Sequence, residues 1–210
     1  MEYFPLGDLG AYLDTHGPIP EGEARQIISQ VLQGLAIMHR EKYAHRDIKP
    51  QNILIHQRPV PGGPRIWWVK LTDFGLTKIM MRTVISASAA IGTPEYAAPE
   101  LVMNWPPRDT SSPPSFDHFA TDIWSLGATA FHILTGILPF TSLFDIFQYF
   151  GSPETRFPHT KLDQHLVSQG GSAFVRALLA PKPEQRPDSE AARSHSWVLS
   201  HTPKIVADRE

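Results

Sequence analysis

The fold is decided by residues His45–Asn52, which read HRDIKPQN. This stretch is polar and interrupted by a proline, which predicts a loop, and the short apolar run Ile53–Ile55 follows it. Asp47 supplies an acid, and Asn52, five residues later, supplies a neutral oxygen donor that suits a hard Mg²⁺ ion. A charged surface turn with satisfied salt bridges is the plainer interpretation of a bare His-Arg-Asp. Asn52 in register favours a chemical role.

The segment before this loop is predicted to be helical from Pro20 to Lys42. Glu21 and Glu23 fall in its first turn, where acidic groups suit a helix N-terminus. Apolar residues recur at three- and four-residue steps, which predicts a helix with one face in the core. This apolar stripe consists of Ile27, Ile28, Val31, Leu32, Leu35 and Met38.

Two more motifs follow in chain order. Asp73–Gly75 (DFG) comes after a predicted strand at Val69–Thr72, and Ala98–Glu100 (APE) comes later. With His45–Asn52 they match the kinase pattern H-R-D-x-x-x-x-N, D-F-G, A-P-E in order. The chain therefore resembles the large, C-terminal lobe of eukaryotic-type serine/threonine protein kinases, over a span from Met1 to about Trp197.

The resemblance implies catalytic roles in phosphoryl transfer, which depends on positioning and on cations that spread charge. Asp47 would orient the substrate hydroxyl and accept its proton. Lys49 would meet the transferring phosphate, and a Lys here resembles serine/threonine rather than tyrosine kinases. Asn52 and Asp73 would hold Mg²⁺, with Asp73 bridging it to the nucleotide phosphates. Thr93 would hydrogen-bond near Asp47 and Lys49.

The resemblance also implies that ATP and Mg²⁺ are the cofactors. The first residues resemble the kinase hinge, which lines the adenine pocket with backbone groups. By that resemblance, the backbone around Glu2 and Phe4 would pair with adenine, and Asp8 would reach the ribose hydroxyls. Leu54 is assigned to the same nucleotide site. The plainer interpretation of the segment is a loop with a helix N-cap at Asp8.

Other matches are structural. Thr121–Thr135 is predicted as an apolar helix that Gly136 stops, and it resembles the buried central helix of the kinase large lobe. There Asp122 would anchor the backbone of the catalytic loop, because an unpaired buried carboxylate is costly. Arg186 matches the family arginine that pairs with the glutamate of Ala-Pro-Glu, here Glu100.

Two stretches depart from the family pattern. Gln57–Trp68 is rich in Pro and Gly and predicts an enlarged hairpin loop, with Trp67 and Trp68 either packed or in a local surface cluster. Asn104–His118 is rich in Pro and Ser and predicts an exposed loop.

Composition sets the class of protein. The 210 residues predict one domain, and we expect a mainly α fold of the α+β kinase family, with residues 1–200 as the C-lobe and 201–210 as a tail. A net charge of −2 argues against a nucleic-acid partner, and the absence of cysteine excludes disulfides. No secretory signal or bilayer-length apolar run is seen, so no membrane association and an intracellular location, cytoplasmic or nuclear, are expected.

The expected function is ATP-dependent phosphorylation of Ser or Thr in protein substrates. No Gly-x-Gly-x-x-Gly and no Val-Ala-Ile-Lys-type strand occurs, so we expect the smaller kinase lobe to be missing and the isolated chain to be weakly active or inactive. The alternative is a non-catalytic binding module that keeps a peptide-docking face. A lobe without its neighbour also predicts an exposed apolar face that a partner would cover.

Leu76–Ala90 matches the kinase activation segment in position. By resemblance, Arg46 would bind a phosphate on this segment through bidentate hydrogen bonds. Ser86 or Ser88 is the expected site of phosphorylation, and Thr83 is less favoured. An ordinary Ser/Ala-rich flexible loop stays open as the alternative. We expect phosphosite mapping of an active preparation to find one of the three hydroxyls modified, and a preparation with none would remove the hypothesis.

Overall fold

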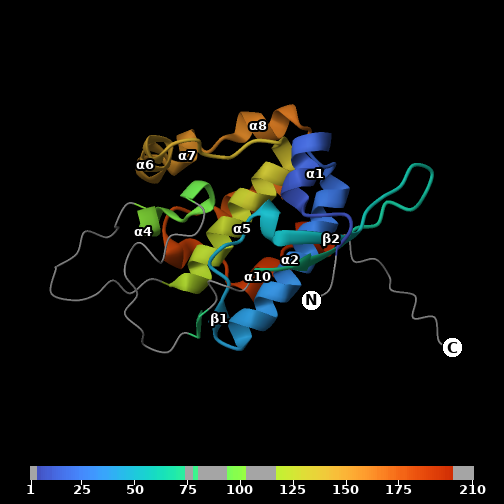
Figure 1. Ribbon diagram of the computed structural model, residues 1–210. Coiled ribbons are helices and arrows are strands. Elements are labelled where there is room, and N and C mark those ends of the chain that lie inside the picture. Colours follow the sequence, from blue (N-terminus) through green and yellow to red (C-terminus); the bar gives the residue numbers. More distant parts are fainter. Residues whose placement is uncertain (1–3, 74–77, 80–93, 103–116, 201–210) are drawn as a thin grey trace.

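The computed structural model describes residues 4–73, 78–79, 94–102 and 117–200 (Figure 1). These residues form a mainly helical fold with two two-stranded antiparallel sheets, which confirms the predicted fold class. The α-helices are α1 (Leu9–His16), α2 (Glu21–Arg40), α4 (Pro99–Val102), α5 (His118–Thr135), α6 (Leu143–Gly151), α7 (Pro153–Arg156), α8 (His159–Gln164), α9 (Gln169–Leu178), α10 (Ser189–Arg193) and α11 (Ser196–Leu199). The strands are β1 (Tyr43–Ala44), β2 (Ile53–Gln57), β3 (Trp68–Leu71) and β4 (Lys78–Ile79), and short 3₁₀ helices are η1 (Pro50–Asn52), η3 (Pro94–Tyr96) and η4 (Pro183–Gln185).

Helix α5 runs through the middle of the fold and is buried along nearly its whole length (Figure 1). It begins before the predicted Thr121, because the carboxylate of Asp117 caps it and accepts the N–H groups of Phe119 at 3.0 Å and Ala120 at 3.2 Å. Gly136 ends it with a left-handed backbone, φ 73, as predicted. Within the described part of the chain, no helix has both the length and the apolarity to cross a bilayer.

Helix α2 packs against β3, α10 and α5, and all of its predicted apolar stripe except the partly buried Met38 lies in the core. Its bounds confirm the predicted helix. Its first residue, Glu21, accepts hydrogen bonds from the Ser168 hydroxyl and from Trp197 Nε1, both at 2.6 Å. Burial acts to raise the pKa of Glu21, yet these bonds outweigh burial and hold the pKa below its ordinary value. Glu21 thereby ties α2 to the start of α9 and to α11.

Strands β2 and β3 form the predicted hairpin. Ile53 lies opposite Leu71 and Ile55 opposite Val69, and an irregularity in register follows Ile55. The connecting loop extends away from the helical body (Figure 1). Trp67 is 2% exposed and packs edge-on against a tyrosine of α1, whereas the neighbouring Trp68 is 48% exposed. One tryptophan therefore packs in the core and the other lies on the surface.

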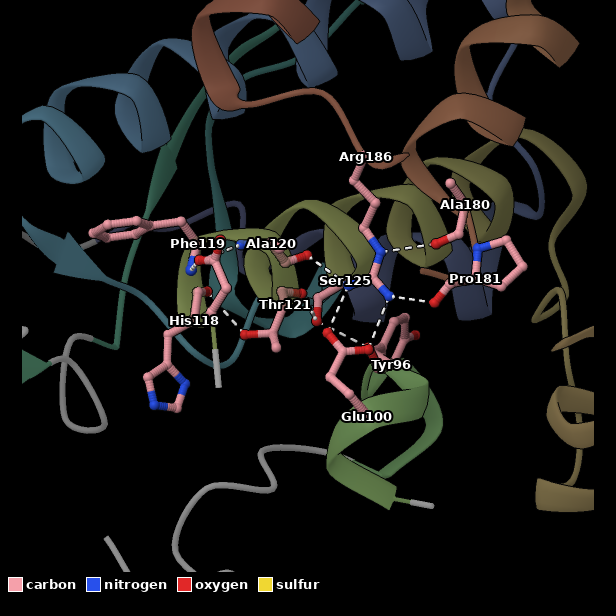
Figure 2. A network of polar contacts seen from close by, with 11 residues as sticks. Tyr96, Glu100, His118, Phe119, Ala120, Thr121, Ser125, Ala180, Pro181 and Arg186 are labelled. Carbon is pink, nitrogen blue, oxygen red and sulfur yellow. Dashed lines mark hydrogen bonds and ion pairs between the residues drawn. The ribbon is translucent and has the colours of Figure 1, made fainter. Parts of the chain in front are cut away.

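Helix α4 is tied to the core by a buried ion pair. Arg186 meets the carboxylate of Glu100 through two bonds of 2.7 and 2.8 Å, as predicted (Figure 2). The same guanidinium donates to the carbonyls of Ala120, Ala180 and Pro181, and the side chain has no solvent exposure. All charged atoms of the pair are therefore matched by hydrogen bonds, which a buried ion pair requires.

Replacement of Arg186 by Ala is expected to lower the free energy of unfolding by about 3–5 kcal/mol, because Glu100 would stay buried without its cation. Urea denaturation of the purified protein measures the loss. Arg193→Ala is the matched control, since Arg193 and its partner Glu190 are 40% and 60% exposed and such pairs contribute about 0–1 kcal/mol. Equal losses from both substitutions would contradict the assignment.

Candidate active site

The loop at His45–Asn52 is held by Asp122 of α5. The Asp122 carboxylate accepts the N–H of His45 at 2.8 Å and the N–H of Arg46 at 2.7 Å. Nε2 of His39, from the end of α2, lies 2.9 Å from the same carboxylate. Asp122 is completely buried, and Arg46 adopts a left-handed backbone with φ 71 that few non-glycine residues adopt. The predicted anchoring of the loop backbone by Asp122 is confirmed.

Three of the residues predicted to be catalytic lie together in this loop. Nδ2 of Asn52 donates to the backbone carbonyl of Asp47 at 2.7 Å and to Asp47 Oδ2 at 2.9 Å. Nζ of Lys49 lies 2.7 Å from the same Oδ2, and the side chains of Asp47 and Lys49 are 10% and 20% exposed. The Asp47 carboxylate is therefore held by an amide and an ammonium group at the edge of solvent.

The segment that leads to Asp73 is fastened to both ends of this loop. The N–H of Thr72 donates to the carbonyl of Asn52 at 3.0 Å. Nδ1 of His45 accepts the N–H of Asp47 at 3.4 Å, so Nε2 carries the proton and donates to the Thr72 carbonyl at 3.0 Å. Asp73 follows directly, with a positive φ of 63. The backbone that leads directly into Asp73 is thus held against both ends of the loop that carries Asp47 and Asn52.

The residues assigned to the nucleotide site also lie near one another. Asp8 and Leu54 pair as an isolated antiparallel bridge, and the N–H of Ile55 donates to the carbonyl of Gly7 at 2.9 Å. Asp8 Oδ1 caps α1 by accepting an N–H at 2.9 Å, which confirms the N-cap interpretation. Phe4 packs against the hairpin and lies under the ammonium of a lysine on β3, 5.4 Å from its ring centroid. The ribose and adenine roles stay predictions.

Several predicted residues fall outside the part of the chain that the structure describes. Glu2, Thr93 and the serines and threonine of Leu76–Ala90 lie outside the described residues. So does most of the predicted loop Asn104–His118, although its last residue proves to be the first residue of α5.

Asn52 and Asp73 carry the oxygen groups that a Mg²⁺ ion takes as ligands, so their chemistry fits the predicted metal site, whose occupation stays a prediction. Both offer oxygen ligands, and because the Asn52 amide nitrogen faces Asp47, its carbonyl oxygen is the atom left to act as a ligand. The described residues contain no cluster of three or more His, Cys, Asp or Glu side chains that would hold a metal alone. Mg²⁺ is commonly bound by one or two protein oxygens together with phosphates.

Arg46, next to Asp47 in the same loop, carries a half-buried positive charge. Nε of Arg46 is buried and has no hydrogen-bond partner among the described residues. Burial lowers the pKa of Arg46, while the nearby Asp122 acts to raise it. Burial and the charge of Arg46 also lower the pKa of His118 below its ordinary value. This arrangement agrees with an anion-binding role for Arg46, which stays a prediction.

Sequence reasoning missed three contributors to this geometry: His39, Thr72 and the backbone carbonyl of Asn52. His39 lies four residues after Leu35 on the buried stripe, so its position alone was a usable signal. Thr72 and Asn52 act through backbone groups, and the residue type does not indicate which partner a backbone group will have.

Comparison with known proteins adds independent evidence. Residues 1–198 match the family model described as the protein kinase domain. The chain is 32% identical over 205 residues to serine/threonine-protein kinase RAD53 of Saccharomyces cerevisiae, covering 94% of this chain and 24% of that protein. It is 29% identical over 202 residues to serine/threonine-protein kinase 17A of Oryctolagus cuniculus, covering 94% of this chain and 46% of that protein. The chain thus spans between about a quarter and half of these relatives.

Solved structures agree. A crystal structure of the Rad53 kinase domain and SCD2 in complex with AMPPNP superimposes with a TM-score of 0.74 at 28% identity, covering 99% of this chain and 71% of that one. A second structure of the Rad53 kinase domain and SCD2 gives a TM-score of 0.75 at 28% identity, with 97% and 67% covered.

Replacement of Asp122 by Asn is expected to lower the free energy of unfolding by about 2–3 kcal/mol, because an amide accepts on one side only and would turn a donor toward the second N–H of the loop. Chemical denaturation measures this. Asp117→Asn on the same helix is the control, because Asn caps helices about as well as Asp. An Asp122→Asn variant as stable as this control would refute the anchoring role.

Proposed function

This chain belongs to the protein kinase domain family, and on that premise we propose that it carries the catalytic centre of a serine/threonine protein kinase. The reaction is transfer of the terminal phosphoryl group of ATP to a Ser or Thr hydroxyl of a protein substrate. The observation that supports it best is the cluster of Asp47, Lys49 and Asn52, fastened through Thr72 to Asp73.

The cluster suggests how each side chain acts. Asp47 orients the substrate hydroxyl and accepts its proton, and the bonds from Asn52 and Lys49 hold its carboxylate in one orientation. Lys49 places an ammonium group beside the carboxylate, where it also meets the transferring phosphate as a point charge. When bound through Asn52 and Asp73, Mg²⁺ supplies positive charge to the phosphate oxygens. Thr93 is proposed to join Asp47 and Lys49 at the acceptor site.

The nucleotide is proposed to lie between β2 and the segment before α1. Glu2 and Phe4 would offer backbone groups to adenine, Leu54 would contact the base, and Asp8 would keep one carboxylate oxygen for the ribose while the other caps α1. The AMPPNP in the related Rad53 structure supports ATP as the nucleotide.

The 210 residues contain no Gly-rich loop and no strand lysine of the kinase type. We therefore propose that they turn over slowly by themselves and that a smaller lobe or a partner covers the face around Phe4 and Leu6, the latter 42% exposed. The alternative function is that of a non-catalytic binding module, a lobe that keeps a peptide-docking face but does not transfer phosphate.

A phosphotransfer assay with Mg·ATP and Ser/Thr peptide mixtures tests the proposal. The Asp47→Asn variant is expected to lose at least about a hundredfold in rate, because it keeps the shape of the side chain but removes the base. Asp163→Asn, an exposed substitution on α8, is the control and should leave the rate unchanged. Equal residual rates in the wild type, Asp47→Asn and the control would favour the non-catalytic lobe.

A further inference from the structure

Two glutamines of α2 bind the backbone of residues 65–69, which lead into β3 and form its first part. Gln26 donates to the carbonyl of Arg65 at 2.9 Å and accepts the N–H of Trp67 at 3.1 Å. Gln30 donates to the carbonyl of Trp67 at 2.9 Å and accepts the N–H of Val69 at 3.1 Å. The two side chains therefore satisfy four consecutive outward-facing backbone groups of one strand edge.

The spacing explains why two glutamines suffice. Residues four apart on a helix are separated by about 6 Å along its axis, and residues two apart on a strand by about 6.7 Å. The spacing between Gln26 and Gln30 therefore matches the two-residue repeat of the strand. Each side-chain amide pairs with the strand backbone as a residue of a neighbouring strand would. The next position in the series is Gly34, where an added Cβ would lie 3.4 Å from a methyl group of Leu71. Helix and strand therefore run closely side by side.

The same strand is held at its other edge by β2 and at its start by Glu23. Glu23 accepts hydrogen bonds from Trp67 Nε1 at 2.8 Å and from Arg65 Nη1 at 2.6 Å. A strand fixed on both edges has one register, and a slip by one residue would reverse every side chain.

The strand leads without a connecting loop to the second acid of the active site. After Leu71, the backbone of Thr72 bonds to Asn52 and His45, and Asp73 follows with its left-handed backbone. Any shift of β3 along its own axis would move both Thr72 and Asp73 relative to Asp47.

We propose that Gln26 and Gln30 are positioning residues for Asp73, which set its place by fixing the register of β3 from α2. That Asp73 binds a metal ion together with a nucleotide rests on the proposed function. The effect of the two glutamines on the backbone of Thr72 and Asp73 does not depend on it. A purely stabilising role would loosen the whole fold or only the amides that the glutamines contact. A positioning role requires a selective effect on the backbone at Thr72, which lies farther along the chain than any group that the glutamines contact.

Gln30→Leu is the test variant, since it keeps the size of the side chain and removes both bonds. Gln33→Leu is the matched control, an exposed glutamine on the same helix. Amide hydrogen exchange is followed by NMR in the nucleotide-free protein. We expect exchange at Val69 and at Thr72 to accelerate by about tenfold in Gln30→Leu while buried amides of α5 stay unchanged, and no change in Gln33→Leu. Acceleration at Val69 with Thr72 unchanged would overturn the inference, as would uniform acceleration throughout.

A calorimetric titration with Mn²⁺ and AMPPNP separates this inference from the proposed function. If the wild type binds, Gln30→Leu should bind at least about threefold more weakly, and equal binding despite faster Thr72 exchange would overturn the positioning of the metal ligand. If the wild type does not bind, the proposed function fails while the exchange at Thr72 still decides the backbone claim. Gln30→Met, which removes both hydrogen bonds but keeps an unbranched side chain, serves if Gln30→Leu does not fold, and the same selective acceleration at Thr72 is expected of it.

Discussion

The carboxylate of Asp122 is the constraint on which the rest of the structure depends. It is completely buried, and a buried carboxylate is stable only when donors surround it. The donors are two successive backbone N–H groups, of His45 and Arg46, together with the ring of His39. One side chain therefore joins the central helix α5, the end of α2 and the start of the loop that carries Asp47. Without it the start of the loop would lose its hydrogen bonds to the central helix.

The remaining parts of the candidate site are joined by the same kind of contact. Polar side chains bind backbone groups of segments that are distant in sequence, as Gln30 does for β3 and His45 does for Thr72. Such bonds have one geometry, whereas apolar packing tolerates small shifts. The two long helices supply the rigid frame, and the polar contacts place the loops on it. The pair of Arg186 and Glu100 does the same for α4.

Features set by residues close together in the sequence could mostly be predicted from local patterns, whereas features set by distant residues could not. Helix α2 was predictable because its apolar stripe is periodic, and Asp8 and Gly136 were predictable because caps act on adjacent residues. The start of α5 was misplaced, since the capping Asp117 lies next to a stretch rich in Pro and Ser that concealed it. Trp67 and Trp68 could not be told apart from sequence, because only the strand register decides which ring enters the core.

By itself, the sequence determined the residue types, the order of the three motifs and the positions of the long helices, and hence the family. These are local properties, set by periodicity and by neighbours within a few residues. The anchoring of the loop by Asp122, 76 and 77 residues away, was expected from the family resemblance and not from any local pattern. Only the tertiary structure decided that the backbone of Thr72 joins Asn52 and His45, and that two glutamines of α2 complete a sheet edge. Such contacts depend on how separate elements pack, and no local pattern specifies that packing.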